Sequence, residues 1–138
     1  MDKLTRFGVS LESGLLEKFD RHSKKRKYKN RSEALRDLIR EKLVEEEWLG
    51  SKEVAGVITL VYDHHKRELM NRSTEIQHDY YKYIISSQHI HLDHYNCLET
   101  IIVKGQPGEI KVLADKLQSA KGIKFGTLTA ATTGKELI

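Results

Sequence analysis

Apolar and polar residues alternate near the N-terminus, a pattern that predicts a β-strand. In the stretch RFGVSLE, residues 6–12, the apolar positions are Phe7, Val9 and Leu11. A strand would gather these side chains on one face and leave short polar side chains on the other. One strand is not stable alone, so its simplest partner is the same strand of a second copy, in a two-stranded antiparallel ribbon.

Two helices are expected after this strand. The first has an apolar stripe that includes Leu15 and Phe19, and it ends before Tyr28. In the second, Asn30 can cap the N-terminus, with Glu33 three residues later as in a capping box. The apolar positions expected to form its buried face are Leu35, Leu38, Ile39 and Leu43. A strand and two helices in about 45 residues contain too little core for a monomer, so we expect an intertwined dimer.

The second half of the chain predicts a βαββαβ order. The expected elements are a buried strand at 54–62, a helix at 66–83, a hairpin of 84–94 and 97–104, a helix at 109–120 and a strand at 123–131. This is the order of the ferredoxin-like fold, which many unrelated functions share. We therefore expect an α+β protein with two domains, residues 1–50 and 51–138.

The charge distribution indicates a polyanion-binding surface in the first domain. The net charge is +4, and residues 18–31 hold eight Lys or Arg against one acid, Asp20. Such a cluster suits a nucleic acid, although a solvated basic helix end is an alternative interpretation. No run of 18 apolar residues occurs, so no membrane span is expected. The N-terminus lacks a secretory signal pattern and Cys97 has no second cysteine to pair with, so we expect a cytoplasmic protein.

A candidate metal site lies in SSQHIHLDHYNCLE, residues 86–99, which holds three of the seven histidines and the single cysteine. On a strand, His89 and His91 project from one face about 7 Å apart. The turn at 93–96 then brings Cys97 close to His91. Imidazole and thiolate ligands suit Zn, Cu or Ni and disfavour Mg and Ca. The alternative is a surface hairpin whose histidines merely alternate with apolar residues.

Three ligands leave a four-coordinate metal one ligand short. The remaining histidines are His22, His64, His65, His78 and His94. His22 belongs to the first domain, and strand parity turns His94 away from His89 and His91. His78 lies near the end of the preceding helix, where the hairpin of a neighbouring subunit could reach it. An exposed helix histidine is the alternative interpretation.

Taken together, the two halves resemble the NikR family of nickel-responsive transcription regulators. In that family a ribbon-helix-helix DNA-binding domain precedes a ferredoxin-like regulatory domain of the ACT type. The motifs that carry the resemblance are RFGVSL, YKNRSEALRDLIR, VYDHHKREL, the pair Gln77 and His78, HIHLDHYNCLE and IVKG. Their joint order extends the resemblance over essentially the whole chain.

The resemblance implies one Ni(II) per subunit, bound in a planar set of three nitrogens and one sulfur. Its ligands would be His89, His91 and Cys97 of one subunit and His78 of another. Glu99 matches a position whose carboxylate orients the ligands without binding the metal itself. The family is a homotetramer, a dimer of dimers in which two DNA-binding dimers flank four regulatory domains.

The resemblance also implies contacts with operator DNA. The paired ribbon would place Arg6, Gly8 and Ser10 in the major groove, where Arg can contact guanine through two hydrogen bonds. Gly8 departs from relatives that carry a hydroxyl residue there, and it offers no side-chain contact. Four further positions match residues that meet the phosphate backbone: Arg31, Ser32, Lys66 and Arg67.

The function that these motifs imply is nickel-dependent repression of nickel uptake genes. The resemblance also suggests a second cation site at Glu33 and Asp37, for which a helix cap and a solvated acid are the alternative. One competing hypothesis keeps the regulator and changes the effector to another metal or a small molecule. A second is a zinc hydrolase with Glu99 or Asp93 as its general acid or base, against which stands the absence of an HExxH-type motif.

Overall fold

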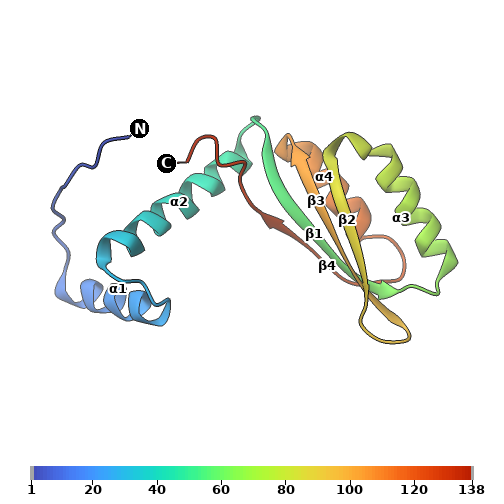
Figure 1. Cartoon of the computed structure of the whole chain (residues 1–138), viewed down its shortest axis with the longest axis horizontal. Helices are drawn as coiled ribbons and strands as arrows, with labels where there is room; N and C mark the ends of the chain where they lie inside the picture. The colour runs from blue at the N-terminus through green and yellow to red at the C-terminus, as the bar shows by residue number, and fades with distance from the viewer. Residues whose placement is uncertain (1, 138) are drawn as a thin grey trace. The chain divides into compact units, whose positions relative to one another are not determined.

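The computed structural model describes residues 2–137, and it divides into two compact units. Of the described residues, 2–43 and 136–137 form the first unit and 44–135 form the second. The division between Leu43 and Val44 lies inside helix α2 (Arg31–Leu49), and the domain boundary at residue 50 stays a prediction. Each unit is described separately (Figure 1).

In the first unit, residues 2–12 form no regular secondary structure. The side chains of Phe7 and Val9 are 70% and 61% exposed. The predicted strand is thus not formed within one chain, because a strand requires a hydrogen-bonded neighbour and this one was expected to come from a second copy.

Helices α1 (Ser13–Lys25) and α2 follow as the sequence predicted. The predicted cap of α2 is confirmed, since the backbone N–H of Glu33 donates to Asn30 Oδ1 at 2.9 Å. The apolar face of α2 was expected to be buried in a dimer, and the single chain leaves most of it uncovered. Leu35 is half-buried, but Leu38, Ile39 and Leu43 are exposed. Two helices alone offer these side chains too little surface to pack against.

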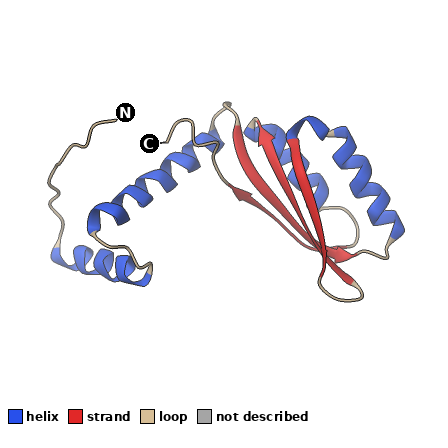
Figure 2. Cartoon of the chain, viewed as in Figure 1, coloured by secondary structure: helices blue, strands red, loops and turns tan. Residues whose placement is uncertain are grey.

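The second unit contains a four-stranded antiparallel sheet (Figure 2). Its elements are β1 (Val54–Asp63), α3 (Arg67–Asp79), the 3₁₀ turn η1 (Tyr81–Tyr83), β2 (Ile84–His91), β3 (Asn96–Gly105), α4 (Pro107–Gln118) and β4 (Ile123–Ala130). The strand order is β2-β3-β1-β4, and the predicted βαββαβ arrangement is confirmed. The largest boundary differences are that α3 ends at Asp79, before η1, that β2 ends at His91 rather than at residue 94, and that α4 begins and ends two residues earlier than predicted.

The core lies between one face of this sheet and the two helices α3 and α4, which lie on the same side (Figure 1). Alternate residues of β1 are buried, as expected for a strand with one covered face. The helices add Leu69 and Ile76 from α3 and Ile110, Leu113 and Leu117 from α4. Within residues 2–137, no helix has the length and apolar character needed to cross a membrane.

Candidate metal centre

Strand register places five chemically active side chains on one face of the sheet. In the β2–β3 pair, His89 lies opposite Glu99 and His91 lies opposite Cys97. In the β1–β3 pair, Tyr62 lies opposite Cys97. Directly opposite residues project to the same face, with Cβ atoms about 5 Å apart. Because Cys97, Glu99 and Tyr62 are buried, this is the face that the helices cover.

His89 is oriented between the cysteine and the glutamate. Its Nδ1 lies 3.7 Å from Cys97 Sγ, and its Nε2 lies 2.9 Å from Glu99 Oε2. Two atoms bound to one transition metal, each about 2 Å from it, lie at most about 4 Å apart. The residues present therefore fit a metal bound through Nδ1 and Sγ. The Glu99 carboxylate would then hold the other ring nitrogen, as is usual for metal-binding histidines.

The Glu99 carboxylate is 1% exposed and is held by three donors. Oε1 accepts a hydrogen bond of 2.8 Å from the Tyr62 hydroxyl. Oε2 accepts one of 3.2 Å from Gln77 Nε2, and it also contacts His89 Nε2. Gln77 Nε2 in turn lies 3.1 Å from the Ser73 hydroxyl. A buried carboxylate is costly unless it is paired in this way, so Glu99 ties β1, β2 and α3 together.

Burial also controls the acid–base chemistry of this site. It raises the pKa of the Cys97 thiol, against a lowering effect of the Tyr62 hydroxyl. Burial and the bond to Glu99 raise the pKa of Tyr62, which therefore remains a hydrogen-bond donor at neutral pH. A metal binds the thiolate, so loading the site requires Cys97 to release its proton.

His64 is a residue of this region to which the sequence reasoning gave no role. Its ring stacks on that of His91, with centroids 4.2 Å apart and planes 5° apart. Its Nε2 is buried and has no hydrogen-bond partner in the described part of the chain. The centroid of the His65 ring lies 4.2 Å from that of His64 and 5.2 Å from that of His94. The signal was the pair of histidines directly after the buried strand, in VYDHHKREL.

The fourth predicted ligand, His78, is not brought to the other three within one chain. It lies in the last turn of α3, and the centroid of its ring is 6.5 Å from that of the Tyr81 ring. Among residues 2–137, no group of three His, Cys, Asp or Glu side chains is placed to hold a metal. The single chain thus brings His89 and Cys97 together and puts His91 opposite Cys97, while the four-ligand set stays a prediction.

Neither acid suggested for hydrolysis is available as a catalytic group. Glu99 is engaged as described above. Asp93 Oδ1 accepts hydrogen bonds of 2.8 Å from the backbone N–H groups of Tyr95 and Asn96, and the Asn96 amide also contacts it. These bonds lower the pKa of Asp93 to about 2. Asp93 therefore closes the hairpin turn.

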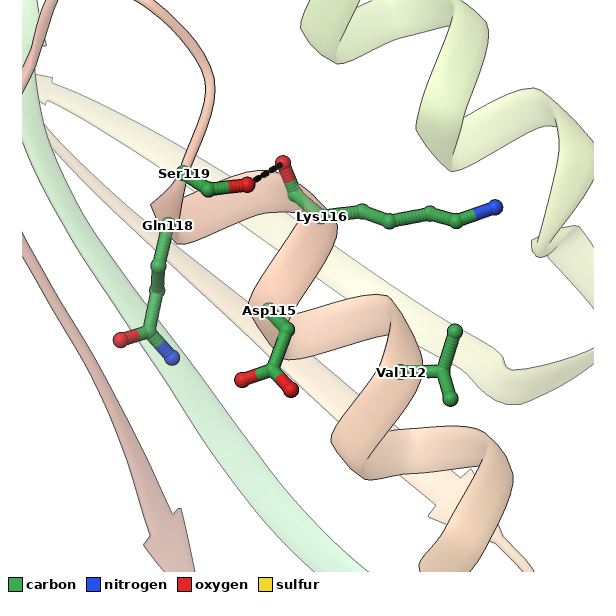
Figure 3. A pocket seen from close by; sticks show the side chains of 5 residues that line it. All are labelled: Val112, Asp115, Lys116, Gln118 and Ser119. Carbon is green, nitrogen blue, oxygen red and sulfur yellow. Dashed lines mark hydrogen bonds between the residues drawn. The ribbon is translucent and has the colours of Figure 1, made fainter.

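A surface pocket on α4 offers no catalytic set either (Figure 3). Its lining residues are Val112, Asp115, Lys116, Gln118 and Ser119. The side chains of Asp115 and Lys116 point in different directions, and the Ser119 hydroxyl bonds the backbone carbonyl of Lys116 at 3.4 Å. The lining includes no histidine or cysteine, so the candidate chemistry stays at the hairpin.

The predicted DNA-contacting residues lie in both units. Arg6, Gly8 and Ser10 are exposed in the segment before α1. Arg31 donates from Nε and Nη2 to the Asp20 carboxylate, at 3.0 and 2.9 Å.

In the first turn of α2, Ser32 is exposed. Lys66 and Arg67, at the start of α3, line a pocket of about 460 Å³ together with Glu68, Arg72 and Lys121. Four basic side chains against one acid give this pocket a net positive charge, which suits a phosphate group.

The predicted second cation site is partly engaged by protein groups. Glu33 and Asp37 lie one turn apart on α2. Asp37 Oδ2 accepts a hydrogen bond of 2.6 Å from the Tyr28 hydroxyl, and this bond raises the pKa of Tyr28. Asp37 Oδ1 lies 4.0 Å from Arg40 Nη1. A cation there would have to share Asp37 with these neighbours.

Comparison with known proteins gives a consistent result for both units. Residues 55–131 match the NikR C terminal nickel binding domain, and residues 5–46 match the ribbon-helix-helix protein, copG family. A putative nickel-responsive regulator of Desulfovibrio desulfuricans is 53% identical over 137 residues, which is 99% of each chain. One from Thermococcus onnurineus is 52% identical over 137 residues, again 99% of each.

One solved structure shares the fold alone. It is an uncharacterized protein from Thermotoga maritima with a TM-score of 0.54 and 13% identity, and the match covers 59% of this chain and 100% of that one.

Tyr62→Phe removes one donor from the buried Glu99 carboxylate, and we expect it to lower the free energy of unfolding by about 1–3 kcal/mol. Urea denaturation at fixed protein concentration measures the effect. Tyr95→Phe is the matched control, because Tyr95 is 61% exposed in the hairpin turn. Equal losses in the two variants would contradict the role assigned to the Tyr62 hydroxyl.

Asp93→Asn tests the turn by its pH dependence. The pKa of Asp93 is lowered from 3.8 to about 2, so its contribution is fully present above pH 4 and is lost as the pH falls from about 4 to about 2. We expect the thermal midpoint of Asp93→Asn to lie below that of the wild type at pH 7 and to fall less between pH 4 and pH 2. Parallel curves over that interval would contradict this assignment.

Proposed function

The chain belongs to the family of nickel-responsive regulators that join a ribbon-helix-helix domain to a NikR C-terminal nickel-binding domain, and on that premise we propose that it represses nickel uptake genes. It is a transcription regulator and not an enzyme, so the zinc hydrolase hypothesis is rejected. Ni(II) is the effector, and operator DNA in the cytoplasm is the target.

The proposed nickel ligands are His89, His91 and Cys97 of one subunit and His78 of another, with one Ni(II) per subunit. The observation that carries this assignment is the orientation of His89. Its Nδ1 faces the Cys97 sulfur at 3.7 Å, while its Nε2 faces the Glu99 carboxylate at 2.9 Å. Bound nickel would join the hairpin of one subunit to the α3 of another.

Glu99 gives this site a connection to α3. Gln77 donates to the same carboxylate that orients His89, and Gln77 directly precedes His78 in the chain. A ligand bound at His89 therefore bears on the helix that presents His78 to the neighbouring subunit. Metal binding and the arrangement of subunits become one linked equilibrium.

Exposed apolar surface supports the proposed homotetramer, a dimer of dimers. In the first unit the side chains that a paired ribbon would cover include Phe7, Val9 and Ile39, which are 70%, 61% and 48% exposed. In the second unit Ile102 and Phe125 are 37% and 55% exposed on the sheet. Surfaces of this kind are buried in stable oligomers.

On DNA, Arg6, Gly8 and Ser10 would face base edges in the major groove. Phosphate contacts would come from the remaining predicted positions, which are Arg31, Ser32, Lys66 and Arg67. Arg31 would exchange the Asp20 carboxylate for a phosphate, because a guanidinium can donate two parallel hydrogen bonds to either group. We propose the second cation site at Glu33 and Asp37 as a separate element of the same regulator.

Operator binding with and without nickel tests the function. Duplexes selected from a random pool by the nickel-loaded protein should bind at least about tenfold more tightly with Ni(II) than with a chelator, within the usual range of allosteric coupling. Fluorescence anisotropy at fixed salt measures both affinities. Equal affinity would contradict the metal switch even if DNA binding itself persisted.

Two alanine variants of the same hairpin sharpen this experiment. Cys97→Ala should lose the nickel response, whereas His94→Ala should keep it, because His94 lies outside the proposed ligand set. A full nickel response in Cys97→Ala would instead favour another metal site or a small-molecule effector.

A further inference from the structure

Trp48 anchors the last turn of α2 to the core of the second unit. It is the single tryptophan of the chain, and only 6% of it is exposed. A tryptophan at the end of a long helix is seldom so fully buried. Neither the sequence motifs nor the metal site assign it any role.

The anchor is bonded as well as packed. Trp48 Nε1 donates to the backbone carbonyl of Ala131 at 2.9 Å, and Ala131 N–H donates to the carbonyl of Ala55 in β1 at 2.9 Å. Lys111 of α4 donates from Nζ to the backbone carbonyl of Trp48 at 3.1 Å. One helical turn is thereby attached to β1, to α4 and to the segment that follows β4.

Gly56 in β1 provides the space for the indole ring. A Cβ at this position would lie 3.2 Å from Cη2 and Cζ2 of Trp48 and 3.1 Å from the Thr129 carbonyl oxygen. These distances are shorter than ordinary van der Waals contact, so a side chain here would force the ring or the Thr129 backbone to move by a few tenths of an ångström. The glycine in an otherwise apolar strand is therefore explained by the close approach of Trp48.

The same strand face reaches the candidate metal centre. Gly56, Ile58, Leu60 and Tyr62 alternate along the buried face of β1. At one end, Gly56 lies against the ring of Trp48. At the other end, the Tyr62 hydroxyl donates a hydrogen bond to Glu99 and lies 3.3 Å from His89 Nδ1. The two ends of this face are roughly 20 Å apart at about 3.3 Å per residue. Close-packed interiors have low compressibility and transmit strain, so this strand face is a physical connection between the two ends.

We propose that Trp48 is a positioning residue that couples the nickel centre to DNA binding through α2. The inference rests on the proposed function. α2 is one helix from Arg31 to Leu49, and its N-terminal residues are those proposed to meet phosphate. Bound at the proposed ligands, nickel would fix the hairpin and, through the contacts that His89 makes with Glu99 and Tyr62, one end of β1. The indole of Trp48, packed on Gly56, holds the C-terminal end of α2 to the other end of β1.

The test compares operator affinity with Ni(II) and with a chelator in variants of the full chain. Trp48→Ala should bind nickel within about threefold of the wild type but lose most of the ratio between the two operator affinities, a drop of about tenfold or more. Trp48→Phe keeps the apolar contact and should restore most of the ratio. Leu49→Ala is the matched control, since Leu49 is the next residue and 83% exposed.

Gly56→Ala keeps the proposal falsifiable if Trp48→Ala does not fold. It should lower the ratio as Trp48→Ala does, and it should shift the fluorescence of Trp48 to longer wavelength as the ring is displaced. A wild-type ratio retained in folded Trp48→Ala or in Gly56→Ala with a displaced ring would overturn this inference alone. A ratio of one in the wild type would overturn the proposed function, and this inference with it.

Discussion

The buried carboxylate of Glu99 is the constraint on which the second unit depends. At 1% exposure it requires charged or polar partners, and it obtains them from Tyr62, Gln77 and His89. These donors belong to three different elements, β1, α3 and β2. The hydrogen bonds that make the carboxylate tolerable also orient His89 toward Cys97. The same contacts therefore stabilise the sheet and hold His89 in place at the candidate metal centre.

Local patterns in the sequence predicted most of the fold. The buried strand β1, the helix cap at Asn30 and the hairpin between His89 and Cys97 were all predicted, because each depends on residues that are close in the chain. The end of β2 at His91 was not predicted. Asp93 accepts hydrogen bonds from the backbone N–H groups of the turn, and the strand therefore ends earlier than expected. Leu38 and Ile39 are exposed in the single chain, because the burial expected for that face of α2 depends on a second chain.

The candidate site shows the same limit. Strand parity and a short turn predicted that His89, His91 and Cys97 share one face, and the register agrees. Parity says nothing of the stacking of His64 on His91, which depends on how the loop after β1 folds back. It also cannot locate His78, whose proposed partners lie in another subunit. That the metal is nickel follows from the family match. The geometry of the described residues explains why one subunit alone would not provide a complete ligand set.

The central claim is that the nickel centre is shared between subunits, and mixed oligomers test it most directly. If His78 completes the site of a neighbouring subunit, Cys97→Ala and His78→Ala would each break every site in a homo-oligomer. Refolded together, they would pair the intact His89, His91 and Cys97 of one variant with the intact His78 of the other. Absorption spectroscopy during a Ni(II) titration should then show a thiolate-to-nickel band in the mixture and in neither variant alone. A band in the wild type with none in the mixture would contradict the shared site.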